Sequence, residues 1–170
     1  KWTRYYFGMI TGVDEQFGRI VQAINNAGLK EDTIVVFTSD HGNCVGTHNH
    51  STKNNHYEES MRVPLLVRWS GQIEPRHDDL LFTTPDFYPT LLNLMGFSDH
   101  IPKTVQGQNH TEILTTGKGR RPDFQPYMWM PVGQPKFGRR GVRTHRFKLE
   151  VTNMPDQPQK VILHDLKDDP

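Results

Sequence analysis

Apolar residues recur every three or four positions along the first part of the chain. The stripe consists of Ile10, Val13, Phe17, Ile20, Val21, Ile24 and Ala27. This spacing places them on one face of an α-helix, and Gly28 follows where a left-handed C-cap commonly ends a helix. The β-branched run 33–38 comes next and is apolar on both faces, which is typical of a parallel strand covered by helices. The pattern therefore predicts an α/β arrangement that begins with half of a β-α-β unit.

A second short strand is expected at 64–69, after one helical turn at 58–62. Thr84 and Pro85 then open another helix as N-cap and first residue. We expect its inner face to comprise Tyr88, Leu91, Leu92 and Met95. Two strands cannot cover their own two-sided apolar surfaces, so the rest of the same polypeptide is expected to complete the sheet. The chain is therefore interpreted as a fragment of a longer protein.

The last part of the chain has a different pattern, in which strands follow one another without helices between them. They are predicted at 127–132, 140–151 and 161–166, with a turn at 153–159. Strands in such succession form an antiparallel sheet. We therefore divide the chain into an α/β part at 1–96, an irregular surface excursion at 97–126 and a small antiparallel subdomain at 127–170.

Composition excludes several classes of protein. The chain has 20 Lys and Arg against 19 Asp and Glu, a formal net charge of +1, which argues against a nucleic-acid or membrane-surface binder. No apolar run approaches the roughly 20 residues that span a bilayer, so we expect no membrane crossing. The single cysteine, Cys44, excludes an internal disulfide framework.

The most informative stretch runs from Thr38 to Gly42, where the first predicted strand ends. Ligands of open α/β sheets bind outside the carboxyl ends of strands. Asp40 offers a carboxylate oxygen to a hard divalent cation, and His41 can add an imidazole nitrogen. Taken alone, Asp40-His41-Gly42 is a weak signal of a metal site, because an Asp at a strand end often binds loop amides instead.

The residues that follow give this stretch its context. They are Gly46-Thr47-His48, Lys53, Tyr57-Glu58-Glu59 and Arg62-Val63-Pro64. In this order and spacing, after Thr38-Ser39-Asp40-His41-Gly42, they resemble the sulfatase family. The flanking segments agree, namely Thr11-Gly12-Val13-Asp14, Ala27-Gly28-Leu29, 141–149 and 163–170.

The resemblance implies hydrolysis of a sulfate ester in an alkaline-phosphatase-like α/β/α sandwich, with a calcium ion beside the sulfate of a small molecule or glycan. It makes Asp40 and His41 metal ligands and Lys53 the residue that holds the sulfate oxygens. His48 matches a histidine of the same loop and either contacts substrate as a catalytic group or organises the loop. Glu58, Glu59 and Arg62 are expected to stabilise the turn. A cation and an ammonium group aimed at sulfate oxygens stabilise the charge of the transition state, and an imidazole can protonate the departing alkoxide.

The family pattern fails at one place. Sulfatases make a formylglycine nucleophile from a Cys or Ser followed two residues later by Pro and then by Arg, and no such motif occurs here. Cys44 precedes Val45 and Gly46 instead. We expect the nucleophile and further acidic metal ligands upstream, so that this chain carries half of an active site and is inactive alone. The resemblance also favours an exported protein.

Two other functions remain open. A phosphatase or phosphodiesterase of the same superfamily uses a similar metal-centred site and would differ in the upstream nucleophile. A non-enzymatic zinc-binding module is the second alternative, although the spacings match no common zinc motif. Its candidate ligands are His41, Cys44, His48, His50 and His56.

Overall fold

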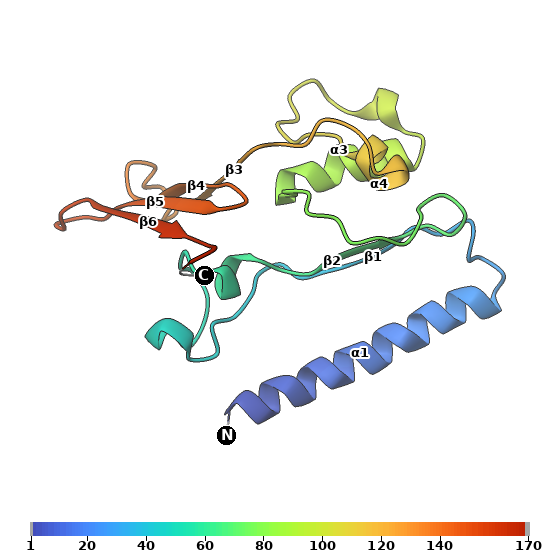
Figure 1. Cartoon of the computed structure of the whole chain (residues 1–170), viewed down its shortest axis with the longest axis horizontal. Helices are drawn as coiled ribbons and strands as arrows, with labels where there is room; N and C mark the ends of the chain where they lie inside the picture. The colour runs from blue at the N-terminus through green and yellow to red at the C-terminus, as the bar shows by residue number, and fades with distance from the viewer. Residues whose placement is uncertain (1, 169–170) are drawn as a thin grey trace. The chain divides into compact units, whose positions relative to one another are not determined.

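The computed structural model describes residues 2–168, so Asp169 and Pro170 of the predicted tail lie outside the described residues. The chain divides into two compact units, residues 1–74 and 75–170 (Figure 1). Among the described helices, none combines the length and the apolar character that a membrane crossing requires.

The first unit begins with the predicted amphipathic helix, α1 (Trp2–Asn26). Phe17 of its apolar stripe packs against Phe37 with 4.8 Å between ring centroids. At the end of the helix, Asn25 accepts a hydrogen bond of 2.8 Å from Arg68. The earlier part of the stripe is exposed, with Ile10 47% and Val13 55% accessible. Within this unit, α1 therefore contacts the strands through the later part of the stripe.

The two predicted strands are β1 (Val35–Thr38) and β2 (Leu65–Arg68), and they pair antiparallel, from Val35 opposite Arg68 to Thr38 opposite Leu65. The expected parallel direction is therefore wrong for this pair. A strand that is apolar on both faces can pair in either direction, because the connection between two strands determines whether they are parallel or antiparallel. Here the connection ends in the one-turn helix α2 (Glu58–Met61), and the chain re-enters the sheet at the end where β1 stops.

The second unit contains the predicted helix α3 (Thr84–Leu94), but a different face is buried. The buried residues are Asp86, Pro89, Thr90 and Leu94, whereas Tyr88 is 51% and Met95 50% exposed. Thr83, one residue before the predicted cap, donates to the Asp86 carboxylate from its backbone N–H (2.8 Å) and hydroxyl (3.0 Å). The same carboxylate accepts from the N–H of Gln108 at 2.7 Å. The expected inner face was wrong because the Asp86 carboxylate occupies the buried face, where the cap residue Thr83 and the loop residue Gln108 supply its hydrogen bonds.

Residues 97–126, predicted to be irregular, include a 3-10 turn η2 (Ser98–His100) and helix α4 (Thr111–Thr116). Two of these residues are nearly inaccessible, since His110 and Ile113 are each 2% exposed. His110 lies 3.5 Å from the Asp86 carboxylate, and its backbone N–H donates to the Thr90 hydroxyl at 3.1 Å. This stretch therefore packs onto α3.

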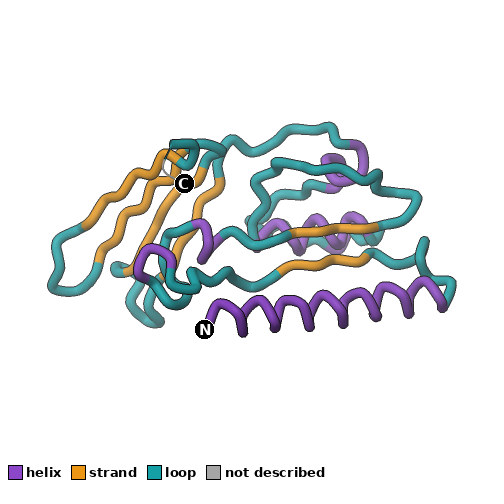
Figure 2. The backbone as a smooth tube through the Cα atoms, turned by 60° about the horizontal axis from the view of Figure 1, so that its bottom comes forward, coloured by secondary structure: helices purple, strands orange, loops and turns teal. Residues whose placement is uncertain are grey.

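The chain ends in the predicted antiparallel sheet, with four strands rather than three. They lie side by side in sequence order (Figure 2), as β3 (Gln125–Trp129), β4 (Gly138–Arg143), β5 (Phe147–Asn153) and β6 (Lys160–Asp165). The predicted strand 140–151 is thus β4 and β5 joined by a tight turn, in which the Thr144 N–H donates to Phe147 at 2.8 Å. The residues between Val142 and Phe147 include no Gly, Pro, Asn or Asp, the residues that usually mark a turn, and for that reason the sequence pattern did not show it.

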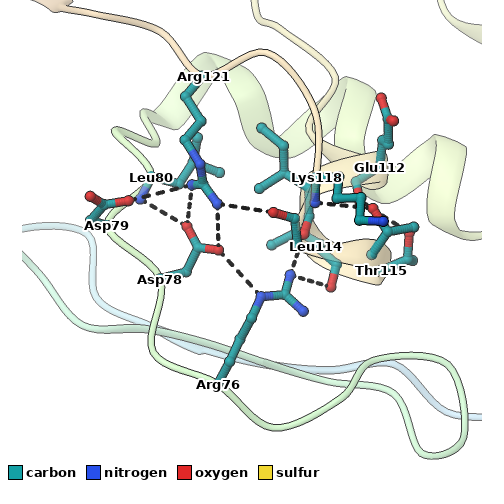
Figure 3. Close-up of polar contacts among 12 residues, drawn as sticks. Arg76, Asp78, Asp79, Leu80, Glu112, Leu114, Thr115, Lys118 and Arg121 are labelled. Carbon is teal, nitrogen blue, oxygen red and sulfur yellow. Dashed lines mark hydrogen bonds and ion pairs between the residues drawn. The ribbon is translucent and has the colours of Figure 1, made fainter.

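An ion-pair network within the second unit joins the segment 76–79 to α4 and to Arg121 (Figure 3). Arg121 donates to Asp78 through two guanidinium nitrogens, one of them at 3.0 Å. Arg76 lies 3.3 Å from the same carboxylate and donates to the carbonyl oxygens of Ile113 and Leu114, the latter at 2.7 Å. Hydrogen bonds from Arg121 lower the pKa of Asp78 from 3.8 to about 2, against a smaller opposing effect of burial.

This shift predicts that Asp78→Asn destabilises the protein by about 1 kcal/mol at pH 7, a value reduced for solvent screening. The pKa is lower in the folded state, so the contribution is complete above the unfolded value of 3.8 and disappears as the pH falls towards 2. Urea unfolding at pH 7 and at acid pH measures it. Asp79→Asn is the control, since that side chain is 78% exposed and lies 3.5 Å from Arg121, a longer and more screened contact than that of Asp78. An equal effect of both substitutions, or no pH dependence, would contradict the assignment.

Candidate functional site

The segment between β1 and α2 carries all four predicted site residues. It leaves the strand at Ser39, passes through the 3-10 turn η1 (Thr47–Asn49) and reaches α2 at Glu58. Its backbone contains four non-glycine residues with positive φ, namely Val45, His48, Asn49 and Asn54. Such conformations are uncommon outside glycine and persist where surrounding contacts determine them. The segment is therefore a shaped loop.

Asp40, His41 and Lys53 come together at the start of this loop. The Asp40 carboxylate lies 3.3 Å from Nε2 of His41, and the Lys53 ammonium group contacts the same nitrogen. Lys53 is twelve residues from His41 in sequence, so the return of the loop creates this contact. Asp40 is 82% and His41 37% exposed at the side chain. The three groups thus form an open polar cluster at the end of a strand.

The hydrogen bonds of His41 determine which ring nitrogen carries the proton. Nδ1 lies 2.7 Å from the carbonyl oxygen of Gly42, which can only accept, so Nδ1 donates. In the neutral imidazole Nε2 then keeps its lone pair, which faces Asp40 and Lys53. In histidine ligands of metals, one ring nitrogen commonly donates to a backbone carbonyl, and this hydrogen bond orients the other nitrogen towards the metal. His41 has the same arrangement.

His48 belongs to a different set of contacts. Its Nε2 donates to Oε1 of Glu59 at 3.0 Å, and its ring stacks on Tyr57 with 3.7 Å between centroids and 2° between planes. Although burial favours the neutral acid, a backbone hydrogen bond, the Thr47 hydroxyl and His48 lower the pKa of Glu59 below its ordinary value. We call these three side chains, His48, Tyr57 and Glu59, the clasp.

Gly42 joins the cluster to the helix that bears the clasp. Its N–H donates to the carbonyl oxygen of Ser60 at 2.9 Å. A Cβ built on Gly42 would lie 2.0 Å from the carbonyl oxygen of Glu59. What requires glycine here is the close approach of two backbones. We call this contact the seam.

Cys44 is buried at the base of the loop, with 1% of its surface exposed. Its N–H donates to the Thr52 carbonyl at 3.0 Å, and its Sγ accepts a hydrogen bond from Nδ2 of Asn55 at 3.3 Å. Residues 2–168 contain no group of three or more His, Cys, Asp or Glu side chains arranged to hold one metal ion. The zinc alternative therefore gains no support from the geometry.

The cluster offers a carboxylate oxygen, an imidazole lone pair and an ammonium group within one small region. The first two suit a divalent cation, and the third suits an anionic oxygen next to that cation. Sequence reasoning identified all three residues. It missed the reach of Glu59 across the loop to His48, since it assigned Glu59 to local stabilisation of the turn. The one available signal was the Tyr57-Glu58-Glu59 motif.

Comparison with known proteins places the chain in a family. The family described as Sulfatase matches residues 2–97. An endo-4-O-sulfatase of Bacteroides thetaiotaomicron is 39% identical over 98% of this chain and 36% of its own length. An N-acetylglucosamine-6-O-sulfatase of the same organism is 29% identical over 100% of this chain and 31% of its own.

Solved structures agree with the sequence relatives. The YidJ protein of Bacteroides fragilis superimposes with a TM-score of 0.92 at 44% identity, covering 98% of this chain and 36% of that one. The chain therefore spans about a third of the length of the proteins it resembles.

The seam predicts that Gly42→Ala destabilises the protein, because the added methyl group would overlap the Glu59 carbonyl. We expect a loss of about 1–3 kcal/mol in the free energy of unfolding, as for other overpacked sites. Gly18→Ala is the matched control. Gly18 lies in α1, and a Cβ added there would meet no atom within 4 Å, so alanine should raise stability by about 0.5–1 kcal/mol. Chemical denaturation of both variants checks this, and equal stability of Gly42→Ala and wild type would disprove the seam.

Proposed function

Because the chain belongs to the sulfatase family, we propose that the full-length protein hydrolyses a sulfate ester and that Asp40, His41 and Lys53 supply one side of its active site. Both homologous enzymes named above are sulfatases, and the chain has the fold class of the C-terminal part of the alkaline-phosphatase-like sandwich. The observation that carries the proposal is the convergence of a carboxylate and an ammonium group on one imidazole nitrogen.

The donor set fits a divalent cation in part. Asp40 Oδ2 and His41 Nε2 lie 3.3 Å apart and can face one ion, and the Nδ1 hydrogen bond of His41 holds its lone pair outward. Two ligands do not complete a calcium site, which takes six to eight. We therefore propose calcium held by Asp40, His41 and ligands beyond this cluster. A bound calcium ion would neutralise negative charge on the sulfate oxygens.

Lys53 would act on the same oxygens. Its ammonium group adjoins the proposed metal ligand, so a sulfate beside the cation would lie within its reach. Preorganised positive groups stabilise the charge that develops during transfer. The nucleophile motif of the family is absent from the 170 residues, so we assign no attacking group to this chain. The prediction that His48 contacts substrate remains a prediction, and its established contacts are Glu59 and Tyr57.

We propose a sulfated sugar as the substrate class. The name of one relative specifies 4-O-sulfate and that of the other a 6-O-sulfate of N-acetylglucosamine. The two names specify different sulfate positions, so the family alone does not fix the position here. A panel of monosulfated sugars, assayed for free sulfate, would identify it.

Lys53→Ala in the full-length protein should lower turnover on the order of a hundredfold or more, because it removes one preorganised contact to the sulfate. Folding should change little, since Lys53 is exposed and its truncation leaves no cavity. Sulfate release and thermal melting measure the two effects. Lys53→Arg keeps the charge with a different reach and should be intermediate. Lys103→Ala, at an exposed lysine of the other unit, is the control. Normal turnover of Lys53→Ala would overturn the proposal.

Asp40→Ala should remove bound calcium together with most activity, because the site loses both charge and geometry. Metal content by mass spectrometry and turnover are measured on the same sample. Asp40 also accepts from the His41 N–H at 3.0 Å and from the Ser39 hydroxyl at 3.4 Å, so a loop-capping role is the competing account. That account predicts a lower melting temperature with calcium retained. Asp32→Ala, which removes an exposed carboxylate, is the control.

A further inference from the structure

The loop that carries Lys53 is fastened at its base by buried groups. Cys44, 1% exposed, and Asn55, 8% exposed, bind each other through side chains, and the Cys44 N–H donates to Thr52, the neighbour of Lys53. These contacts close the loop as a ring of fixed length. The tip, residues 46–50, includes η1 and also binds the base, because the N–H (2.9 Å) and the hydroxyl (2.8 Å) of Thr47 donate to the Cys44 carbonyl oxygen.

The clasp adds side-chain contacts that join the tip to α2. His48 has a φ of 54°, a left-handed conformation that turns the chain, and its ring is fixed on one face by Tyr57 and on one edge by Glu59. Glu59 lies in α2, eleven residues after His48. An ionised carboxylate that accepts from an imidazole N–H makes a stronger hydrogen bond than a neutral pair. Glu59 therefore connects the loop tip to the helix.

Glu59 also takes part in the seam. Its backbone carbonyl oxygen lies 2.0 Å from the position of a Cβ built on Gly42, and Gly42 directly follows His41. One residue thus contacts the backbone beside the proposed metal ligand and, through its side chain, the loop that returns with Lys53. Because Lys53 itself is exposed, its place at His41 depends on the backbone of that loop.

We propose that Glu59 is a positioning residue, which acts through His48 and Tyr57 to hold the Lys53 ammonium group at the sulfate site. The proposal rests on the function proposed above for Lys53. It assigns His48 to the clasp rather than to direct contact with substrate. A displacement of a charged group by about 1 Å is enough to lower a catalysed rate on the order of a hundredfold, so a loop contact of this kind has a measurable effect.

A double-mutant cycle on the full-length protein tests the proposal. Glu59→Met removes the acceptor while keeping the length of the side chain, and should lower kcat/KM about 10- to 100-fold for a chromogenic aryl sulfate. In the Lys53→Ala background the same substitution should cost less than about threefold, because the group that it positions is already absent. Glu59→Gln still accepts from His48 and should recover most of the activity. Glu15→Gln and Glu15→Met on exposed α1 are the matched controls.

His48→Asn is the second variant, should Glu59→Met fold poorly. Asparagine tolerates the left-handed backbone of this position while removing the stacked ring. It should show the same dependence on Lys53. Equal losses in both backgrounds, or no loss from Glu59→Met in the wild type, would overturn the positioning role. Full activity of Lys53→Ala would instead reject the proposed function on which this role rests.

Discussion

The seam between Gly42 and α2 is the constraint on which the rest of the site depends. Two backbones approach so closely that a Cβ would lie 2.0 Å from a carbonyl oxygen, and the Gly42 N–H donates to Ser60 at 2.9 Å. The contact fixes the residue after His41 against the helix that contains Glu59. Within the loop between Gly42 and Glu59, the Cys44 N–H donates to the Thr52 carbonyl, and the next residue, Lys53, contacts His41. Three charged or polar groups thereby converge at the end of β1.

The contacts divide the residues of this stretch into separate sets. Groups with open polar atoms, Asp40, His41 and Lys53, gather at the end of β1. His48, Tyr57 and Glu59 instead contact one another and connect the loop to α2. Buried Cys44 and Asn55 hold the base. Residues of these three sets alternate along the sequence motif, so only their contacts show which set each belongs to.

The sequence predicted the helix α1, the strand pair, the helix α3 and a C-terminal antiparallel sheet, because each has a clear period or cap. It did not predict the antiparallel direction of β1 and β2. That direction depends on where η1 and α2 return the chain to the sheet. It missed the buried face of α3, where Asp86 is satisfied by Thr83 and by Gln108, which is distant in sequence. At the site it identified Asp40, His41 and Lys53 from the motif. The partner of His48 depends on loop closure, and no local pattern specifies that.

The most direct test of this account is a crystal structure of the full-length protein with inorganic sulfate and calcium. The account predicts a cation bound by Asp40 and Nε2 of His41, and sulfate oxygens within hydrogen-bond distance of the Lys53 ammonium group. His48 should keep its contact with Glu59 and remain away from the sulfate. A sulfate bound elsewhere, or one held by His48 with Lys53 turned to solvent, would contradict it.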